Sequence, residues 1–543
     1  METRKLNLGH PEILFLLISV AAISPIWYVP YFISQDGSSH VNASAIMLQL
    51  VSGNTFYSEV YTFNSFFVPN SIGHWMMVLL LTIFSPILVT KIMMSITLIG
   101  VAAGVVWLRR SLVGTDIFIS ILIGFILGFN WLWFLGSYNF TLGLAGFAFG
   151  IALYVRWRSK MNFARGVALT VLLGFVFISH LVAFVAFAGS IVFLSFFCEP
   201  ESRKSAIVRT ALSVISTLPL LVIYRIQTVS GETLIPVWRN LSEGWSVSSW
   251  AMRFQSADPF SIISRKTLPF TDLENNLLAM VSPGFWVAIT FIILAAATLF
   301  GPSKKEVLSK RSFPFAVLSL CALLAAMLGP DDFGLYNGSI LRERLVLIGL
   351  ILGVPVFRIE TGSLLKPLVA ICLAFAVMFQ VLATWDYALD NQAATANYIS
   401  ALKKIDDGKN IASVTVLDQK PRFRSEWAAQ AVNYAGFGKD LLLWDNYEMA
   451  HYLFPVMMKD LITKSFVLDL TTSNVLTSGE PVDEANRKIE VLKRCFHDEV
   501  HRIDVLVVYG RDEKLDKIIT AAFDSEPYFE QGKVRLFQRR SDH

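Results

Sequence analysis

Charged residues and cysteines are both scarce in this sequence. Only 16% of its 543 residues are charged, against roughly a quarter in soluble domains, while 54% are hydrophobic. This composition excludes a soluble globular protein and predicts an α-helical, polytopic membrane protein. The net charge of +4 is small and spread over the loops, so no nucleic-acid partner is indicated. The four cysteines contain no CxxC pair, so neither a disulfide framework nor a cysteine-based zinc site is expected.

What the sequence has instead is a series of long apolar runs. They cover residues 11–31, 72–107, 116–135, 140–155, 166–198, 206–226, 283–300, 313–328, 345–357 and 367–385. The first reads as a retained signal anchor. The second is broken near Ser85-Pro86, so one half, 72–84, is expected to be interfacial or re-entrant. The fifth run has no formal charge and is flanked by basic residues on both sides. It should therefore cross the membrane outward and back again, with its turn at Ser179-His180. The total is about eleven crossings.

Lysine and arginine set the orientation, because cytoplasmic loops hold the excess of both. Arg4 and Lys5 place the N-terminus in the cytoplasm, whereas residues 32–90 contain no Lys or Arg at all. The alternation predicts external loops at 32–71 and 227–281 and an extracytoplasmic C-terminus. The expected location is therefore a bacterial inner membrane or a plasma membrane.

After residue 385 the composition becomes charged and mixed. Strand-like runs at 411–417, 503–509 and 534–537 alternate with helix-like stretches at 396–405 and 482–494. Residues 386–543 are therefore predicted to form a small α/β soluble domain behind a transmembrane domain, 1–385.

The polar residues that look out of place all fall on the predicted external side. They are Asp36, His40, Asn139, His180, Asp331, Asp332, Arg342 and Arg344. Ionisable groups at or below a membrane surface cost several kcal/mol unless they are paired or hydrated. Their grouping on one side predicts a water-accessible cavity there.

Each of these residues also has an ordinary structural interpretation. Asp36 can act as the N-cap of an amphipathic helix at 40–50, and the two histidines can be hydrogen-bonded core residues. Asp331 and Asp332 follow Gly329-Pro330, so they suit a solvated turn as well as a metal site.

The arginines at 342 and 344 have two readings. They can form ion pairs at the membrane edge, or they can bind a phosphate, which a guanidinium holds with two hydrogen bonds.

Together, a signal anchor, a first external loop opening on Asp36, many later spans and a C-terminal external domain resemble the GT-C superfamily. These are glycosyltransferases that use polyprenyl-phosphate sugars, including protein O-mannosyltransferases and lipid A aminoarabinose transferases. The span 87–107 followed by the turn Leu108-Arg109-Arg110 is also similar to a turn in such enzymes. Many members carry paired acids at the first-loop position, where this chain has Asp36-Gly37, so the resemblance leaves a divalent metal ion open.

The resemblance implies a lipid-linked sugar donor, surrounding membrane lipids, and a glycan, lipid or protein acceptor. Asp36 would take the acceptor proton in a transfer that usually inverts the anomeric centre, and His40 would orient Asp36 or the acceptor. Arg342 or Arg344 would bind the leaving phosphate, and His180 would line the donor groove. Asn139 is a further substrate-binding candidate. The alternatives are an enzyme like an O-antigen polymerase or ligase, and a lipid or solute transporter.

Overall fold

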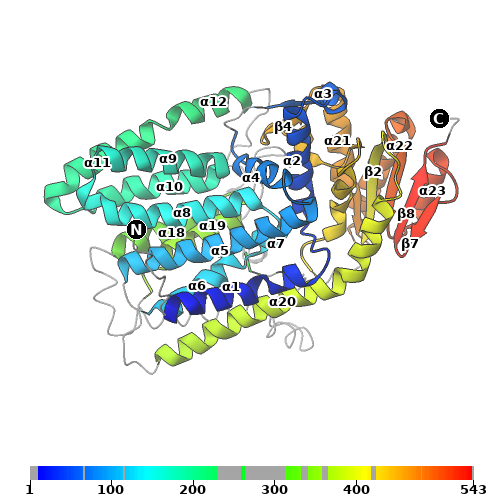
Figure 1. Cartoon of the computed structure of the whole chain (residues 1–543). Coiled ribbons are helices and arrows are strands. Elements are labelled where there is room, and N and C mark those ends of the chain that lie inside the picture. Colours follow the sequence, from blue (N-terminus) through cyan, green and yellow to red (C-terminus); the bar gives the residue numbers. More distant parts are fainter. Residues whose placement is uncertain are drawn as a thin grey trace, which may run out of the picture. The chain divides into compact units, whose positions relative to one another are not determined.

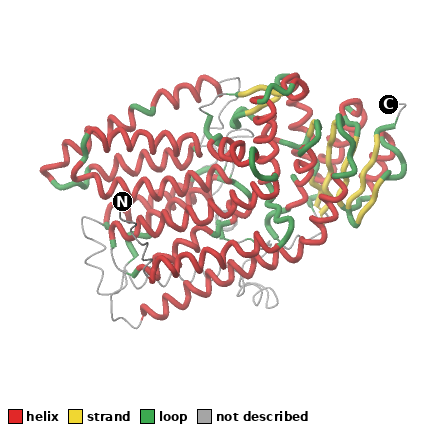
Figure 2. Tube along the Cα trace, viewed as in Figure 1, coloured by secondary structure: helices red, strands yellow, loops and turns green. Residues whose placement is uncertain are grey.

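A computed structural model describes residues 10–64, 68–113, 116–228, 258–260, 262, 291, 312–331, 340–357, 365–417, 423–477 and 480–540. The chain divides into two compact units. The helical unit comprises Met1–Pro25, Ser95–Trp133 and Tyr138–Trp385, and the mixed unit comprises Ile26–Met94, Phe134–Ser137 and Asp386–His543. Figure 2 shows that the strands belong to the C-terminal part of the chain, apart from one short strand near residue 61.

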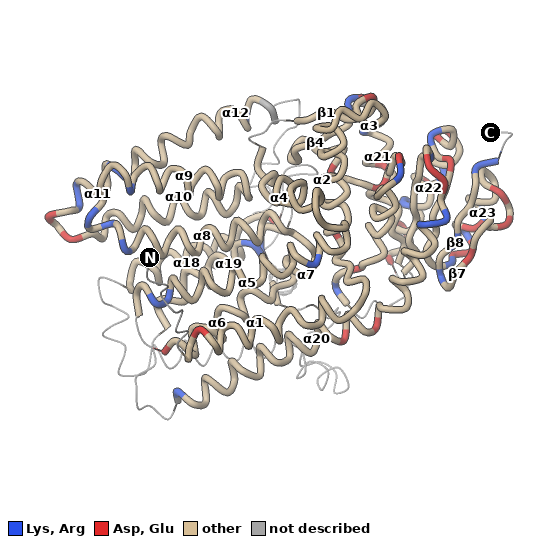
Figure 3. The backbone as a smooth tube through the Cα atoms, viewed as in Figure 1, with Lys and Arg blue, Asp and Glu red and all other residues tan. Residues whose placement is uncertain are grey.

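Apolar helices build the helical unit. In chain order they are α6 (Ile117–Gly128), α8 (Tyr138–Trp157), α9 (Phe163–Ser179), α10 (Leu181–Ser195), α11 (Pro200–Ile215), α12 (Leu218–Thr228), α18 (Phe313–Leu328) and α19 (Leu341–Gly353). Helices α1 (His10–Tyr28), α5 (Pro86–Leu112), α7 (Trp131–Leu135) and α20 (Leu365–Leu402) contribute residues to both units. Helices α8, α9 and α10 pack side by side (Figure 1), and Figure 3 shows α9, α10 and α18 almost without charge.

Some of these helices are long enough to cross a bilayer. Among the described residues, five helical segments are long and apolar enough to cross a membrane, and several shorter apolar helices accompany them. The prediction of an α-helical integral membrane protein is confirmed.

Two predicted breaks are confirmed. Helix α4 (Ile72–Leu81) ends before Ser85, and α5 begins at Pro86. This is expected because the proline ring disfavours a helix interior. At ten residues, α4 is about 15 Å long, which is too short to cross a bilayer. Helices α9 and α10 meet at His180, whose Nδ1 accepts a hydrogen bond from the Val182 N–H at 3.2 Å and so caps α10.

Three predicted boundaries were wrong. The run 116–135 is not one helix, because Asn130 stops α6 by donating to the Leu127 and Gly128 carbonyls and starts α7 by accepting from the Trp133 N–H. Helix α19 begins at Leu341, so the arginines at 342 and 344 belong to its first turn. The helix expected at 396–405 is the end of α20, which continues without interruption from the last apolar run. Apart from residue 291, the run 283–300 lies outside the described residues, as does nearly all of loop 227–281.

A six-stranded mixed sheet organises the C-terminal part of the mixed unit. Its strands are β2 (Asn410–Leu417), β3 (Leu442–Leu443), β5 (Val475–Thr477), β6 (Val505–Tyr509), β7 (Phe529–Gln531) and β8 (Val534–Gln538). The order is β3-β2-β6-β8-β7, with β5 also pairing β2. Strand β2 runs parallel to β3, β5 and β6, while β8 is antiparallel to β6 and β7. The strands expected at 411–417, 503–509 and 534–537 are confirmed.

Helices cover this sheet through narrow apolar stripes. They are α21 (Leu461–Ser473), α22 (Val482–Asp498) and α23 (Glu513–Ala522). On α23 the buried residues Leu515, Ile519 and Ala522 recur at helical spacing, and the remaining faces carry both signs of charge (Figure 3).

The first loop belongs to the same core as the sheet. It contains α2 (Gly37–Val51), α3 (Thr55–Val60) and β1 (Tyr61–Phe63). Strand β1 pairs antiparallel with β4 (Val456–Met458), so Tyr61 stands opposite Met458. Met47 and Tyr61 are buried in one cluster with residues of β2 and β6. The mixed unit is therefore assembled from segments at opposite ends of the sequence.

One glycine fixes the entry to α2. Gly136 has φ +100°, and a Cβ there would lie 2.7 Å from the Gly37 nitrogen and 2.8 Å from Ser34 Oγ. We expect Gly136→Ala to destabilise the start of α2 by roughly 1–3 kcal/mol, because the Gly37 backbone and the Ser34 hydroxyl would both have to move to make room for the methyl group. Hydrogen exchange of the α2 amides would measure this. Gly174→Ala on α9 is the control, since its Cβ meets nothing within 4 Å. Unchanged exchange in Gly136→Ala would show that the turn can relax.

Candidate active site

Asp36 lies at the junction between the first apolar helix and α2. Its backbone N–H donates to the Leu135 carbonyl at 2.8 Å, and its own carbonyl accepts from His40 N–H at 3.1 Å as α2 begins. Asp36 occupies the N-cap position, yet its side chain makes no capping hydrogen bond. The Asp36 side chain is half-buried at the N-terminus of this 15-residue helix, where the helix dipole attracts negative charge. The capping interpretation therefore does not explain why an acid stands here.

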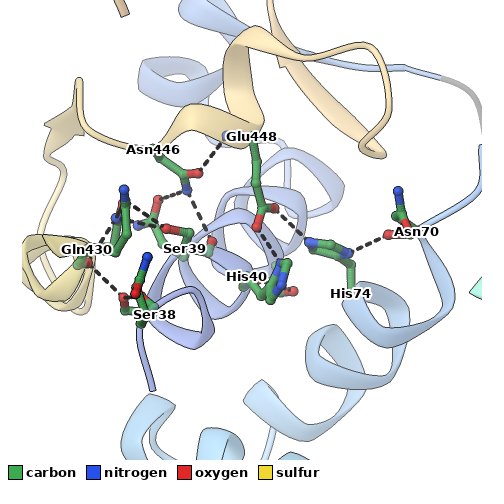
Figure 4. A network of polar contacts seen from close by, with 12 residues as sticks. Ser38, Ser39, His40, Asn70, His74, Gln430, Asn446 and Glu448 are labelled. Atoms are coloured by element: carbon green, nitrogen blue, oxygen red, sulfur yellow. Dashed lines mark hydrogen bonds and ion pairs between the residues drawn. The ribbon is translucent and has the colours of Figure 1, made fainter. Parts of the chain in front are cut away.

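A network of buried polar side chains holds the first turn of α2 (Figure 4). Ser38 Oγ donates to the Gln430 carbonyl at 2.7 Å, and Ser39 Oγ donates to Gln430 Oε1 at 3.0 Å. Asn446 Nδ2 donates to the Ser39 carbonyl at 3.1 Å and to Asn42 Oδ1 at 3.0 Å. Each bond joins the first loop to the C-terminal segment within the mixed unit. The backbone that carries Asp36 and His40 is consequently fixed in position.

His40 belongs to a second, ionisable cluster. Its Nδ1 forms an ion pair with Glu448 Oε1, and Glu448 Oε2 lies 2.8 Å from His74 Nε2 (Figure 4). The three side chains come from α2, α4 and the short 3-10 helix η4 (Tyr447–Ala450). All three are buried, Glu448 and His74 completely so. The His40 and His74 rings lie 5.2 Å apart, edge to face.

The electrostatics of this cluster are strongly coupled. Burial alone raises the pKa of Glu448, but the two histidines together outweigh burial and hold that pKa at about 2. Burial alone lowers the pKa of His40, whereas Glu448, helped by Asp36 and a hydrogen bond to the Gly136 backbone, raises it above its ordinary value. Glu448 is therefore a carboxylate at neutral pH.

Other predicted site residues gather in the helical unit. The Phe140 ring, next to Asn139, packs edge to face on the His180 ring at 5.1 Å. The Arg344 guanidinium lies over the same Phe140 ring at 5.4 Å. His180 and Asn139 are buried, and Arg344 is half-buried. Two of the predicted substrate-binding residues, His180 and Arg344, thus contact one aromatic ring, and Asn139 precedes that ring in the sequence.

The remaining candidates lie elsewhere or are not described. The Arg342 backbone N–H donates to Asp331 Oδ1 at 3.3 Å, and the Leu341 N–H donates to the Asp331 carbonyl at 3.0 Å. Asp331 thus ties the start of α19, which is a structural contact. Asp332 lies outside the described residues.

Sequence reasoning missed three buried ionisable residues of the mixed unit. His74 and Glu448 were overlooked because neither stands out in its own segment. Lys91 on α5 is only 7% exposed, and its Nζ donates to the Val29 carbonyl at 2.6 Å. A lysine within an apolar run indicates a functional residue, and Lys91 could have been recognised from the sequence alone.

Comparison with known proteins identifies the fold. No protein-family model and no curated protein sequence matches the chain. The crystal structure of ArnT from Cupriavidus metallidurans bound to undecaprenyl phosphate is similar at a TM-score of 0.52 and 10% identity, over 97% of this chain and 98% of that one. The cryo-EM structure of the mycobacterial arabinofuranosyltransferase AftD is similar at 0.45 and 13%, over 99% of this chain and 40% of that one. The first match confirms the predicted GT-C-like fold.

Proposed function

We propose that this chain is a membrane glycosyltransferase that moves a sugar from a polyprenyl-phosphate donor onto an acceptor outside the cytoplasm. The observation that carries the proposal is Asp36, an acid at the start of α2 directly after the first apolar helix, in a chain whose fold is similar to that of ArnT. The ArnT structure was determined with undecaprenyl phosphate bound, which supports a donor of that class here. The extracytoplasmic side rests on the absence of Lys and Arg from residues 32–90.

In the proposed reaction Asp36 acts as the general base. The carboxylate removes the proton of an acceptor hydroxyl as the acceptor oxygen attacks the anomeric carbon of the donor sugar. The bond from that carbon to the phosphate oxygen breaks, and the polyprenyl phosphate leaves with the electron pair. A direct displacement of this kind inverts the anomeric centre. The fixed first turn of α2 holds Asp36 for this role.

The donor phosphate requires positive charge, which Arg344 and Arg342 supply in this proposal. Arg344, His180 and Asn139, which all belong to the helical unit, are the proposed donor-binding residues. Membrane lipids surround the site, and the acceptor is a glycan, a lipid or a protein.

The test is a transfer assay with the full chain in detergent. Synthetic undecaprenyl-phosphate pentoses and hexoses would be offered with a panel of acceptors, and products would be identified by mass spectrometry and their anomers by NMR. Transfer from lipid-linked donors with inversion is the expected result. Transfer from nucleotide sugars alone would contradict the proposal.

Arg344→Lys should raise the KM for the donor about tenfold or more, since the lysine keeps the charge but replaces only one of the two paired hydrogen bonds, each worth roughly 1.5–3 kcal/mol. Donor titration of the purified variant would measure the effect. Arg156→Lys is the matched control, because Arg156 is exposed and stacks on Trp107 in the same manner. An unchanged KM for Arg344→Lys would leave Arg344 as a purely structural partner of Phe140.

A further inference from the structure

The His40, His74 and Glu448 cluster has the composition of a metal site. One nitrogen from each histidine and a carboxylate oxygen all lie within 4.8 Å of one another. We propose that these three side chains bind one divalent transition-metal ion of the Zn²⁺ class in the mixed unit. This inference goes beyond the proposed glycosyl transfer and does not depend on it.

The donor set selects the class of ion. Two imidazoles and one carboxylate form a common three-ligand zinc site that keeps a position for water. Mg²⁺ and Ca²⁺ prefer oxygen ligands alone, so two nitrogen donors argue against them. His74 Nε2 and Glu448 Oε2 are 2.8 Å apart, whereas tetrahedral ligands of zinc stand about 3.4 Å apart. Binding would therefore need the ligands to separate by roughly half an ångström.

Contacts outside the cluster orient both rings as metal ligands require. His74 Nδ1 lies 2.8 Å from the Asn70 carbonyl oxygen and donates its proton there, which directs Nε2 toward Glu448. The His40 ring bonds to the Gly136 backbone on one side and turns Nδ1 to Glu448 on the other. Metal-binding histidines characteristically donate their second N–H to a carbonyl or carboxylate in this way.

Hydrogen bonds also fix the backbone that carries the Glu448 carboxylate. The Glu448 N–H donates to Asn446 Oδ1 at 3.2 Å, and Asn446 is itself bonded to the Ser39 carbonyl and to Asn42. Glu448 is completely buried, so its oxygens can reach a cation only within this cluster. An ion here would join α2, α4 and η4, and it would fix His40 one helical turn from Asp36.

Metal content of the full chain tests the proposal. Protein without a polyhistidine tag would be stripped with chelator in detergent, incubated with Zn²⁺, desalted and measured by elemental mass spectrometry. We expect about one Zn²⁺ per chain for the wild type and less than about one-tenth for His74→Gln and for Glu448→Gln. His497→Ala is the control, because its side chain is 83% exposed and belongs to another part of the unit.

A second measurement separates lost binding from lost folding. Bound Co²⁺ should give the wild type a visible d–d spectrum that both variants lack, while their circular dichroism and elution volume without metal match those of the wild type. Stoichiometric binding in both variants, or no binding of Zn²⁺, Co²⁺, Mn²⁺ or Fe²⁺ by the wild type, would reduce the cluster to an ion-pair network. Neither measurement needs a sugar donor, so a metal-binding chain that transfers no sugar would overturn the proposed function alone.

Discussion

The Asp36→Asn variant should fold normally and transfer sugar at least about a hundredfold more slowly than the wild type. Asparagine keeps the size of the side chain and tolerates the same position before a helix, but it cannot accept the acceptor proton. A hundredfold loss corresponds to about 2.7 kcal/mol of transition-state stabilisation. Single-turnover kinetics with a lipid-linked donor would measure it, with kcat falling and the KM for the donor nearly unchanged.

Asp460 offers a matched control for this variant. It also precedes a helix, but its carboxylate accepts from the Thr463 N–H at 2.7 Å and is a true cap. Asp460→Ala should weaken the start of α21 with activity retained, whereas Asp36→Ala should lose activity with little change in helix stability. A fully active Asp36→Asn enzyme would refute the general-base role and leave the fold untouched.

Replacing Glu448 by alanine should destabilise the mixed unit by about 3–5 kcal/mol. The change removes the shared carboxylate and leaves two buried histidines facing each other without a counter-charge. Hydrogen exchange at α2 and η4 would report the loss locally, which matters because a chain of two units need not unfold in one step.

Two further substitutions serve as controls for the expected destabilisation by Glu448→Ala. Glu490→Ala on the exposed face of α22 should stay within about 0.5 kcal/mol of the wild type. Glu448→Gln keeps the volume and a hydrogen-bonding side chain, so it should be milder than Glu448→Ala. Equal protection of α2 and η4 in Glu448→Ala and the wild type would mean that the cluster contributes nothing to stability.

Local patterns in the sequence were sufficient to predict most secondary structure. Pro86 and His180 mark real breaks, and the apolar run 313–328 coincides with α18. The errors arise where one side chain bonds to the backbone around it and interrupts an apolar run, or where no local signal ends a helix. Asn130 ends α6 through its own hydrogen bonds, and α20 runs on past residue 385 because nothing in its sequence stops it.

The candidate site was predictable only in part. Asp36 and His40 attract attention because they follow an apolar span in a segment without Lys or Arg. His74 and Glu448 are 374 residues apart, and no periodicity relates them. Only the fold brings their side chains together, so a single sequence could not indicate the cluster. Lys91, in contrast, was visible as a charge within an apolar run.

The joint construction of the mixed unit also sets an order of events during biosynthesis. Ser38 cannot form its hydrogen bond until Gln430 has been synthesised 392 residues later, and β1 cannot pair until β4 has been synthesised. At 5–20 residues per second, that interval is roughly 20–80 s. During that interval the nascent chain contains an unpaired strand and an incompletely bonded first turn of α2. The proposed chemistry of Asp36 can therefore begin only after the C-terminal segment has been synthesised and has folded against α2, so a chain truncated before Gln430 should be inactive.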